Sequence, residues 1–205
     1  MRVSICADLL HEAQNDATFV NSIIAEDESW CFQYDPQIKR QSAEWRSTGT
    51  LPSKKVRWQP STTKTMIIVF FDARGIVHHE FVPQGQTVNQ EVYISVLRSM
   101  REAVRRRRPD LWASGQWNLL HDNARPHTAL SVLRFLTKHN VTVLPHPPYS
   151  PDLSPCYYFV STTEKRLKGR RHENIETIQA AATMELTDVP KEAFTSCFQD
   201  LQKRG

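Results

Sequence analysis

The sequence predicts a single α/β domain built on a mixed β-sheet with helices on its faces. Two observations lead to this class. Short apolar runs of strand length end at turn residues, and longer segments with apolar residues at helical spacing separate the later runs. Strands that first follow one another and then alternate with helices are typical of a mixed sheet. A length of 205 residues is enough for one such domain with its own core.

The N-terminal segment is expected to be helical. Residues 1–22 have apolar residues at helical spacing, and we interpret them as linker helices that pack on a domain formed by residues 23–205. A strand is then expected with Asp27 near its beginning, because large side chains alternate with smaller or polar ones. The alternating large residues are Trp30, Phe32 and Tyr34.

A polar loop and a hairpin follow the first strand. Residues 41–65 are polar and basic and contain two prolines, which indicates an extended loop. The apolar run 66–71 predicts a buried strand. Residues 72–75 have the composition of a turn, and residues 76–82 are expected to return as the antiparallel partner.

Two helices are expected after the hairpin. Asn89 caps the first, which runs into four consecutive arginines, 105–108, and ends at Pro109. The second covers residues 128–139. Its expected core side consists of Leu130, Val132, Leu133, Phe135 and Leu136.

Two further strands complete the expected sheet. Residues 117–121 form a short central strand that ends at Asp122, and residues 141–144 form the last strand. A proline-rich segment and helical patterns from residue 158 onward follow. The order strand, hairpin, helix, strand, helix, strand, helices is that of the ribonuclease-H-like fold.

Composition sets limits on the function classes. The formal net charge of +4 fits a nucleic-acid partner without requiring one. The four cysteines form no Cys-x-x-Cys pair, so neither a zinc site nor a disulfide framework is indicated, and an intracellular reducing compartment is expected. The longest apolar run, 66–71, is too short to span a bilayer, and no membrane partner is expected.

Two aspartates at strand positions are candidate metal ligands. Phosphodiester cleavage by two divalent cations about 3.5–4 Å apart needs clustered carboxylates, and Mg²⁺ prefers oxygen ligands. Asp27 on the first strand and Asp122 at the end of a neighbouring strand could meet at one edge of the sheet. Each aspartate alone is more often a cap, turn or surface residue, so the pair by itself is a weak signal.

Three segments together resemble the catalytic blocks of the mariner family of DNA transposases. They are Glu26-Asp27-Glu28-Ser29-Trp30, Asp122-Asn123-Ala124-Arg125-Pro126-His127 and residues 147–159. The similarity extends over nearly the whole chain. It implies a ribonuclease-H-like (retroviral-integrase-like) fold and metal-dependent, cut-and-paste cleavage and transfer of DNA strands. It also implies that Asp27 and Asp122 are catalytic residues that hold Mg²⁺ or Mn²⁺.

Tyr157 stands where the family has its third catalytic aspartate. A phenol with a pKa near ~10 is uncharged at neutral pH and is a poor ligand for Mg²⁺. The thiol of Cys156 is soft, Glu164 lies about 10 Å further along a helix, and nothing requires Asp152 to come closer. We therefore expect one well-held cation, a weakened second metal site and impaired catalysis.

Basic residues are the candidate DNA contacts, because phosphate contacts dominate affinity. These candidates are Lys54, Lys55, Arg57, Lys64 and Arg125. The runs 105–108 and 165–171 are further candidates, although charged runs are more often solvated surfaces. Three histidines, His121, His127 and His146, lie close to the catalytic blocks in sequence. We expect them to pack or to support ligands rather than to form a metal-binding trio.

The leading interpretation is a mariner-type transposase catalytic domain that is truncated and catalytically impaired. The family's two N-terminal helix-turn-helix modules have no counterpart in these residues. The expected partner is DNA, as transposon ends or nonspecific duplex, and the resemblance also implies a homodimer and a nuclear location. Two alternatives stay open: a retained, non-catalytic DNA-binding or oligomerisation module, and an active nuclease with a substitute ligand.

Overall fold

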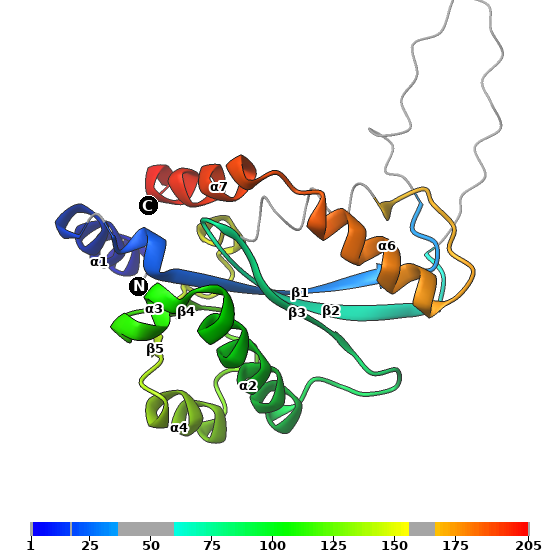
Figure 1. The fold of residues 1–205 in the computed structure, drawn as a ribbon, viewed down its shortest axis with the longest axis horizontal. Helices are drawn as coiled ribbons and strands as arrows, with labels where there is room; N and C mark the ends of the chain where they lie inside the picture. The colour runs from blue at the N-terminus through cyan, green and yellow to red at the C-terminus, as the bar shows by residue number, and fades with distance from the viewer. Residues whose placement is uncertain (1, 17, 37–59, 156–166, 205) are drawn as a thin grey trace, which may run out of the picture.

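The fold is a five-stranded sheet with helices on both faces (Figure 1). This computed structural model describes residues 2–16, 18–36, 60–155 and 167–204. The strand order is β3-β2-β1-β4-β5. The predicted α/β class with a mixed sheet is confirmed.

The central strand is β1 (Ile23–Phe32), which has both kinds of neighbour. It pairs antiparallel with β2 (Lys64–Asp72) and parallel with β4 (Asn118–Leu120). The expected hairpin is present, since β2 pairs antiparallel with β3 (Gly75–Val82). The short strand β5 (Thr142–Val143) pairs parallel with β4 and closes the sheet on that side.

The start of β1 corrects the sequence prediction. We expected Asp27 near the beginning of this strand, but β1 starts at Ile23 and Asp27 lies in its middle. The physical reason is burial: the residues from Ile23 to Glu26 are all buried and pair with neighbouring strands, so the sheet continues toward the N-terminus.

One face of the sheet is covered by α2 (Gln90–Arg107) and α4 (Leu130–Lys138). As predicted, Asn89 caps α2, because its side chain accepts hydrogen bonds from the backbone N–H groups of Glu91 and Val92 at 3.0 and 2.9 Å. As predicted, α2 ends before Pro109, but a further helix that was not predicted follows. Proline is well tolerated at the start of a helix, and α3 (Pro109–Ser114) begins there.

The predicted core side of α4 is partly wrong. Val132 and Leu136 are buried, but Leu130 and Leu133 are 63% and 43% exposed. Residues four apart lie on the same stripe of a helix, and in α4 the stripe of Val132 and Leu136 packs on the core shared with α2. Leu130 opens the helix and Leu133 faces away from this stripe.

The opposite face is covered by α6 (Ile175–Thr187) and α7 (Lys191–Arg204). Apolar side chains of these helices meet the second face of β1 and β2 in one cluster. Asn174 caps α6 by accepting from the N–H of Thr177 at 2.8 Å, and the Thr177 hydroxyl accepts from the N–H of Asn174. The helices expected near the C-terminus are therefore present from Ile175 onward.

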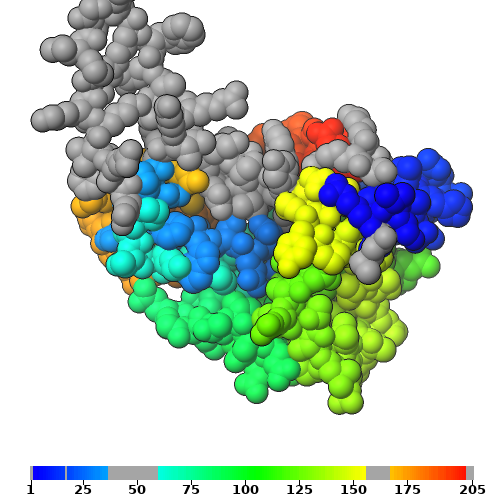
Figure 2. Space-filling view, turned by 180° about the vertical axis from the view of Figure 1, so that it is seen from behind, coloured from blue at the N-terminus to red at the C-terminus, as the bar shows by residue number. Residues whose placement is uncertain are grey.

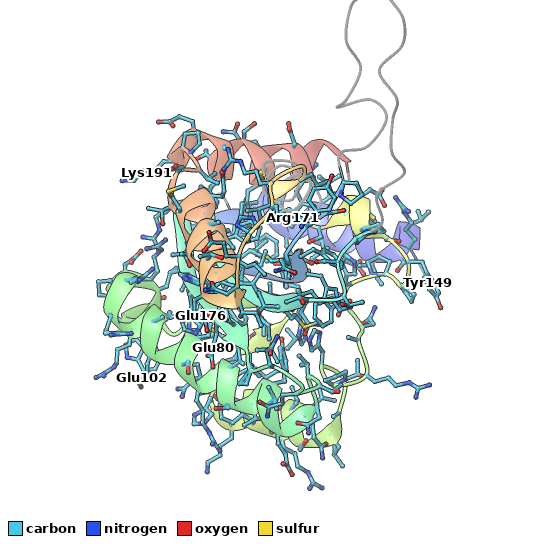
Figure 3. All side chains as sticks on the ribbon, turned by 90° about the vertical axis from the view of Figure 1, so that its right-hand side faces the viewer. Glu80, Glu102, Tyr149, Arg171, Glu176 and Lys191 are labelled. Atoms are coloured by element: carbon cyan, nitrogen blue, oxygen red, sulfur yellow. The ribbon has the colours of Figure 1, made fainter. Side chains whose placement is uncertain are left out.

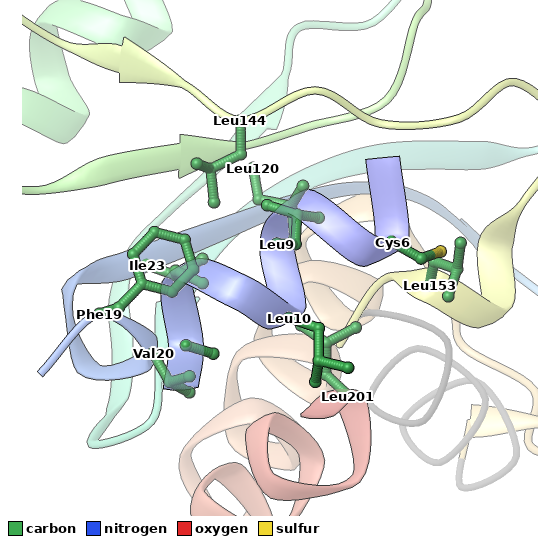
Figure 4. A pocket seen from close by; sticks show the side chains of 11 residues that line it. Cys6, Leu9, Leu10, Phe19, Val20, Ile23, Leu120, Leu144, Leu153 and Leu201 are labelled. Atoms are coloured by element: carbon green, nitrogen blue, oxygen red, sulfur yellow. The ribbon is translucent and has the colours of Figure 1, made fainter. Parts of the chain in front are cut away.

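The N-terminal residues form α1 (Arg2–Asn15) and a short 3₁₀ turn, η1 (Val20–Ser22). Helix α1 lies beside the segment drawn in yellow in Figure 2, and Arg2 pairs there with Asp152. A small apolar cavity of about 50 Å³ lies beneath α1 (Figure 4). Along the described stretches of the chain, helices of the length and apolarity needed to cross a membrane do not occur.

Candidate metal-binding site at the ends of β1 and β4

The pairing of β1 with β4 brings the two predicted aspartates to neighbouring strands. Ala25 of β1 is opposite Leu120, the last residue of β4. Asp27 and Asp122 each lie two residues further along the chain, and the strands run in the same direction. Continued by two residues, this register sets Asp27 opposite Asp122 at the carboxyl end of β4.

Side-chain alternation gives the face of the sheet on which Asp27 lies. Ala25 and Leu120 belong to the core cluster shared with α6 and α7. Side chains two residues apart on a strand point to the same face. Asp27 therefore shares the face of Ala25, whereas Asp122 lies beyond the last residue of β4 and its carboxylate meets His127, whose ring stacks on Tyr93 of α2. Glu26 and Glu28 point to the opposite face, toward α2.

Asp122 borders an open hollow of about 410 Å³. Its side chain is 68% exposed, which leaves it accessible to ions and ligands. The hollow is otherwise lined by Asn123, Ala124 and residues 146–151. Tyr149 lies in this proline-rich segment with a φ of 54°, and its fully exposed ring projects from the surface (Figure 3).

Beneath Asp122 lies a buried network centred on His127, whose side chain is 1% exposed. The Nδ1 atom of His127 is 2.8 Å from Oδ1 of Asp122, and its Nε2 is 3.2 Å from Oε1 of Glu28. The ring stacks on Tyr93 of α2 at a centroid distance of 4.0 Å. His121 completes the network, with its Nδ1 2.8 Å from the Tyr93 hydroxyl.

This network makes one of its two central histidines charged and leaves the other neutral. Burial opposes a charge on His127, but hydrogen bonds to Asp122 and Glu28 and the nearby charge of Glu26 outweigh it and raise its pKa to about 10. Burial lowers the pKa of His121 to about 3, and the charge of His127 adds to this effect. At neutral pH His127 is therefore an imidazolium and His121 is neutral.

The same network shifts the pKa values of the carboxyl groups of Asp122 and Glu26 in opposite directions. The hydrogen bond from His127 is the main cause that lowers the pKa of Asp122, and the backbone N–H of Ala124 adds to it. Asp122 is therefore ionised, as a metal ligand must be. Burial raises the pKa of Glu26 to about 8 despite the opposing effect of His127.

The geometry favours the aspartates over the buried residues as cation ligands. One ligand atom each from Glu26, His121 and His127 lies within 4.8 Å of the others. However, an imidazole binds a metal in its ring plane, and the rings of His121 and His127 are stacked with an interplanar angle of 12°. Two stacked rings do not point their nitrogens at one ion. The exposed carboxylate of Asp122 offers the oxygen that Mg²⁺ and Mn²⁺ prefer.

Several predicted site residues lie outside the described residues: Lys54, Lys55, Arg57, Cys156, Tyr157 and Glu164. Their assigned roles stay predictions. Asp152, the remaining substitute ligand that we considered, pairs with Arg2.

The two DNA-contact candidates among the described residues, Lys64 and Arg125, lie on different elements. The Nζ atom of Lys64 is 3.8 Å from the ring centroid of Trp30, so this residue packs on the last part of β1. Arg125 is exposed in the loop that follows Asp122. Arg125 is therefore near the hollow in the chain, while Lys64 lies at the start of β2.

The arginine run at the end of α2 is partly structural. Arg108 forms an ion pair with the fully buried Asp72 and donates to the carbonyl oxygen of Gly75. Arg105 pairs with Glu102 at 2.6 Å on the surface. Arg108 therefore stabilises the β2–β3 turn, which corrects its inclusion among the phosphate-contact candidates.

Sequence reasoning missed Glu28 and Tyr93. Glu28 follows Asp27 in the sequence, but strand alternation separates their side chains and turns Glu28 toward α2. Tyr93 was not among the predicted site residues. Its hydroxyl would have been a signal, because a buried tyrosine needs a hydrogen-bonding partner. His127 and His121 were expected to support or pack, and their contacts agree with that expectation.

Comparison with protein families and curated proteins relates the chain to transposases. The family model "Transposase (partial DDE domain)" matches residues 35–114. The chain is 33% identical over 181 residues to the human histone-lysine N-methyltransferase SETMAR, covering 88% of this chain and 26% of that protein. It is 32% identical to the mariner Mos1 transposase of Drosophila mauritiana, covering 87% of this chain. The match spans 51% of the Mos1 protein, about half its length.

Solved structures show the same relationship. A pre-cleavage Mos1 transpososome aligns with a TM-score of 0.89 and 28% identity, covering 98% of this chain and 58% of that one. The Mos1 catalytic domain aligns with a TM-score of 0.80 and 27% identity, covering 98% and 86%. The sheet and flanking helices described above thus have the ribonuclease-H-like arrangement of these catalytic domains.

Proposed function

We propose that this chain, a homologue of the mariner transposase catalytic domain, acts on DNA phosphodiester bonds at the ends of β1 and β4. The observation that supports this most is the parallel pairing of β1 with β4 up to Ala25 and Leu120, because the same register continued by two residues would bring Asp27 and Asp122 to neighbouring positions. The exposed carboxylate of Asp122 beside a hollow of about 410 Å³ leaves room for a DNA backbone.

Asp27 and Asp122 would hold Mg²⁺ or Mn²⁺ in this proposal. Asp122 fits a hard cation, because its carboxylate is ionised, exposed and adjacent to open space. Bound divalent cations would activate the attacking oxygen and stabilise the leaving oxygen of the phosphodiester. Asp27 would supply negative charge from β1 and Asp122 from the loop just after β4, two residues beyond the last paired positions, Ala25 and Leu120.

The proposal includes impaired catalysis. By the resemblance of residues 147–159 to the third catalytic block, Tyr157 would take the position of the third aspartate, and an uncharged phenol cannot offset cation charge as a carboxylate does. The second cation would be held weakly, and the developing charge on the leaving oxygen would be stabilised less. We therefore expect this chain to bind metal at one site and to cleave DNA poorly.

The expected partner is DNA, bound through Arg125 and the basic loop that includes Lys54, Lys55, Arg57 and Lys64. Mos1 itself has been solved in a paired-end complex and in a strand transfer complex. By analogy we propose that two copies of this chain pair on DNA. Chromosomal DNA as the substrate would place the protein in the nucleus.

A plasmid assay tests the function. Supercoiled plasmid is incubated with Mg²⁺ or Mn²⁺ and the wild-type chain, Tyr157→Asp, or Tyr157→Asp with Asp122→Ala. We expect little nicking by the wild type, increased nicking by Tyr157→Asp, and loss of that gain with Asp122→Ala.

Two results would contradict the proposal. Strong wild-type nicking that disappears in Asp122→Ala would show a competent site and refute the impairment. A Tyr157→Asp protein that is folded but binds no Mn²⁺ and nicks no DNA would refute the assignment of the active site. Lys191→Met, at an exposed position that opens α7 and with no assigned role at the site, is the control for nonspecific effects of a charge change.

A further inference from the structure

We propose that His127 is the positioning residue for Asp122: it fixes the carboxylate so that Oδ2 alone is presented to the cation. This inference rests on the proposed function, because it concerns the same metal site. The proposal comes from a bridge that His127 forms between Asp122, beyond β4, and Glu28 on β1.

The hydrogen bonds of Asp122 are concentrated on one oxygen. Oδ1 is 2.8 Å from Nδ1 of His127 and accepts from the backbone N–H of Ala124 at 2.9 Å. A carboxylate oxygen has about two lone-pair directions, so Oδ1 is fully used. Among the described residues no donor reaches Oδ2. Asp122 therefore offers one oxygen, which makes it a ligand through a single atom rather than through both.

The other side of the His127 ring is anchored as firmly. Its Nε2 is 3.2 Å from Oε1 of Glu28. A carboxylate only accepts when ionised, so the bridge uses N–H groups on both ring nitrogens. The ring is 1% exposed and stacks on Tyr93 at 4.0 Å, which prevents it from rotating freely.

This bridge connects the three elements on which the site depends. Glu28 belongs to β1, the strand of Asp27, while Tyr93 belongs to α2. Asp122 and His127 lie at the two ends of the loop between β4 and α4. His127 thus ties this loop to the strand that holds the other aspartate. Without the bridge, the exposed Asp122 side chain would sample several rotamers and bind a cation less tightly.

The test measures Mn²⁺ binding to the full chain by the electron paramagnetic resonance signal of free Mn²⁺. His127→Phe keeps an aromatic ring that can stack on Tyr93 but donates no hydrogen bond. His127→Gln keeps one side-chain amide that can donate to Asp122. His11→Phe, at an exposed position on α1, is the matched control. Circular dichroism and urea unfolding of each variant show whether it is folded.

We expect the Mn²⁺ dissociation constant to rise about 10- to 100-fold in His127→Phe, as for other groups that orient metal ligands. It should rise less in His127→Gln, because that variant retains one donor, and should not change in His11→Phe. A folded His127→Phe protein with wild-type Mn²⁺ affinity would overturn the positioning role. If His127→Phe does not fold, two results together would overturn the positioning role instead. A folded His127→Gln protein would bind Mn²⁺ with wild-type affinity, and a Mn²⁺-bound structure would show both Asp122 oxygens on the ion.

A further variant separates this inference from the proposed function. Asp122→Asn should weaken Mn²⁺ binding if Asp122 is a ligand. If Asp122→Asn binds Mn²⁺ as the wild type does, the proposed metal site is wrong. If Asp122→Asn loses binding while His127→Phe and His127→Gln keep it, the metal site stands and only the role of His127 fails.

Discussion

At the residue scale, the main feature of the site is a pair of stacked histidines, one of them charged and the other neutral. The rings of His121 and His127 lie 5.0 Å apart between centroids, yet their surroundings differ. His127 faces the carboxylates of Asp122 and Glu28, whereas His121 meets the Tyr93 hydroxyl. Hydrogen bonds to two carboxylates offset the free-energy cost of burying the charge of His127. At His121 the nearby charge of Asp122 also favours the charged form, but the effect of burial is larger.

A pH dependence of stability follows from the low pKa of His121. In the unfolded chain this histidine takes up a proton near its ordinary pKa of 6.5, but in the folded chain it does so only near 3. Protons therefore favour the unfolded chain, and the contribution of neutral His121 is present above pH 6.5 and lost as pH falls. Between pH 7 and pH 5 this should cost about 2 kcal/mol of unfolding free energy.

The measurement is urea unfolding of metal-free protein at several pH values. His121→Asn keeps an oxygen that can accept from Tyr93 but does not titrate. The wild type should lose about 2 kcal/mol more than His121→Asn between pH 7 and pH 5. Parallel pH profiles for the two proteins would contradict a low pKa at His121.

At this scale the sequence indicates candidate ligands but not the contacts around them. Asp27 and Asp122 are candidates because their surrounding segments resemble a known pattern, and their roles as ligands stay predictions. The contacts of Glu28 and Tyr93 were not predictable, because they depend on which face of β1 meets which face of α2. That information comes from long-range packing of residues about 65 positions apart in the chain, for which a single sequence has no local signal.

At the element scale, the end of α2 separates structural arginines from surface arginines. Arg108 is paired with Asp72, whose side chain is fully buried, and the Arg108 side chain is only 12% exposed. Arg105 forms an exposed pair with Glu102. Neighbouring residues of one charge run thus differ in their contribution to stability.

Substitution of these two arginines by methionine should show the difference. Arg108→Met removes the main partner of a buried carboxylate and should lower the unfolding free energy by roughly 3 kcal/mol. Arg105→Met removes an exposed pair and should change it by less than about 0.5–1 kcal/mol. Equal midpoints in urea unfolding would show that the Asp72–Arg108 pair does not stabilise the fold.

Most elements were predictable from local pattern. The hairpin of β2 and β3 and the cap at Asn89 have short-range signals that need no knowledge of the rest of the molecule. The start of β1 and the exposed face of α4 were not predicted correctly, because both depend on what packs against them. Leu130 and Leu133 are apolar, but only the fold decides that they face outward.

At the scale of the whole molecule, the chain should bind DNA weakly and with little sequence preference. Arg125 is an exposed residue of the loop after Asp122, Lys64 lies at the start of β2, and Lys54, Lys55 and Arg57 add charge to the sequence between β1 and β2. Contacts to phosphates supply affinity but carry no direct sequence information.

Fluorescence anisotropy with short duplexes measures this binding. Affinity should fall steeply between 50 mM and 200 mM salt, because counterions released from DNA drive the association. Duplexes of different sequence should bind alike, and Arg125→Ala should weaken all of them to a similar degree. Tight binding to one duplex that persists at high salt would contradict this expectation.

The central claim is that Asp27 and Asp122 share one cation across the β1–β4 pair. A crystal structure of the chain soaked with Mn²⁺ tests it most directly, because the anomalous signal locates the ion. We predict one Mn²⁺ between the two side chains, with an oxygen from each at a coordination distance, about 2.0–2.1 Å for the corresponding Mg²⁺ site. Carboxylates too far apart to contact one ion, or Mn²⁺ bound elsewhere with both aspartates free of it, would contradict the account.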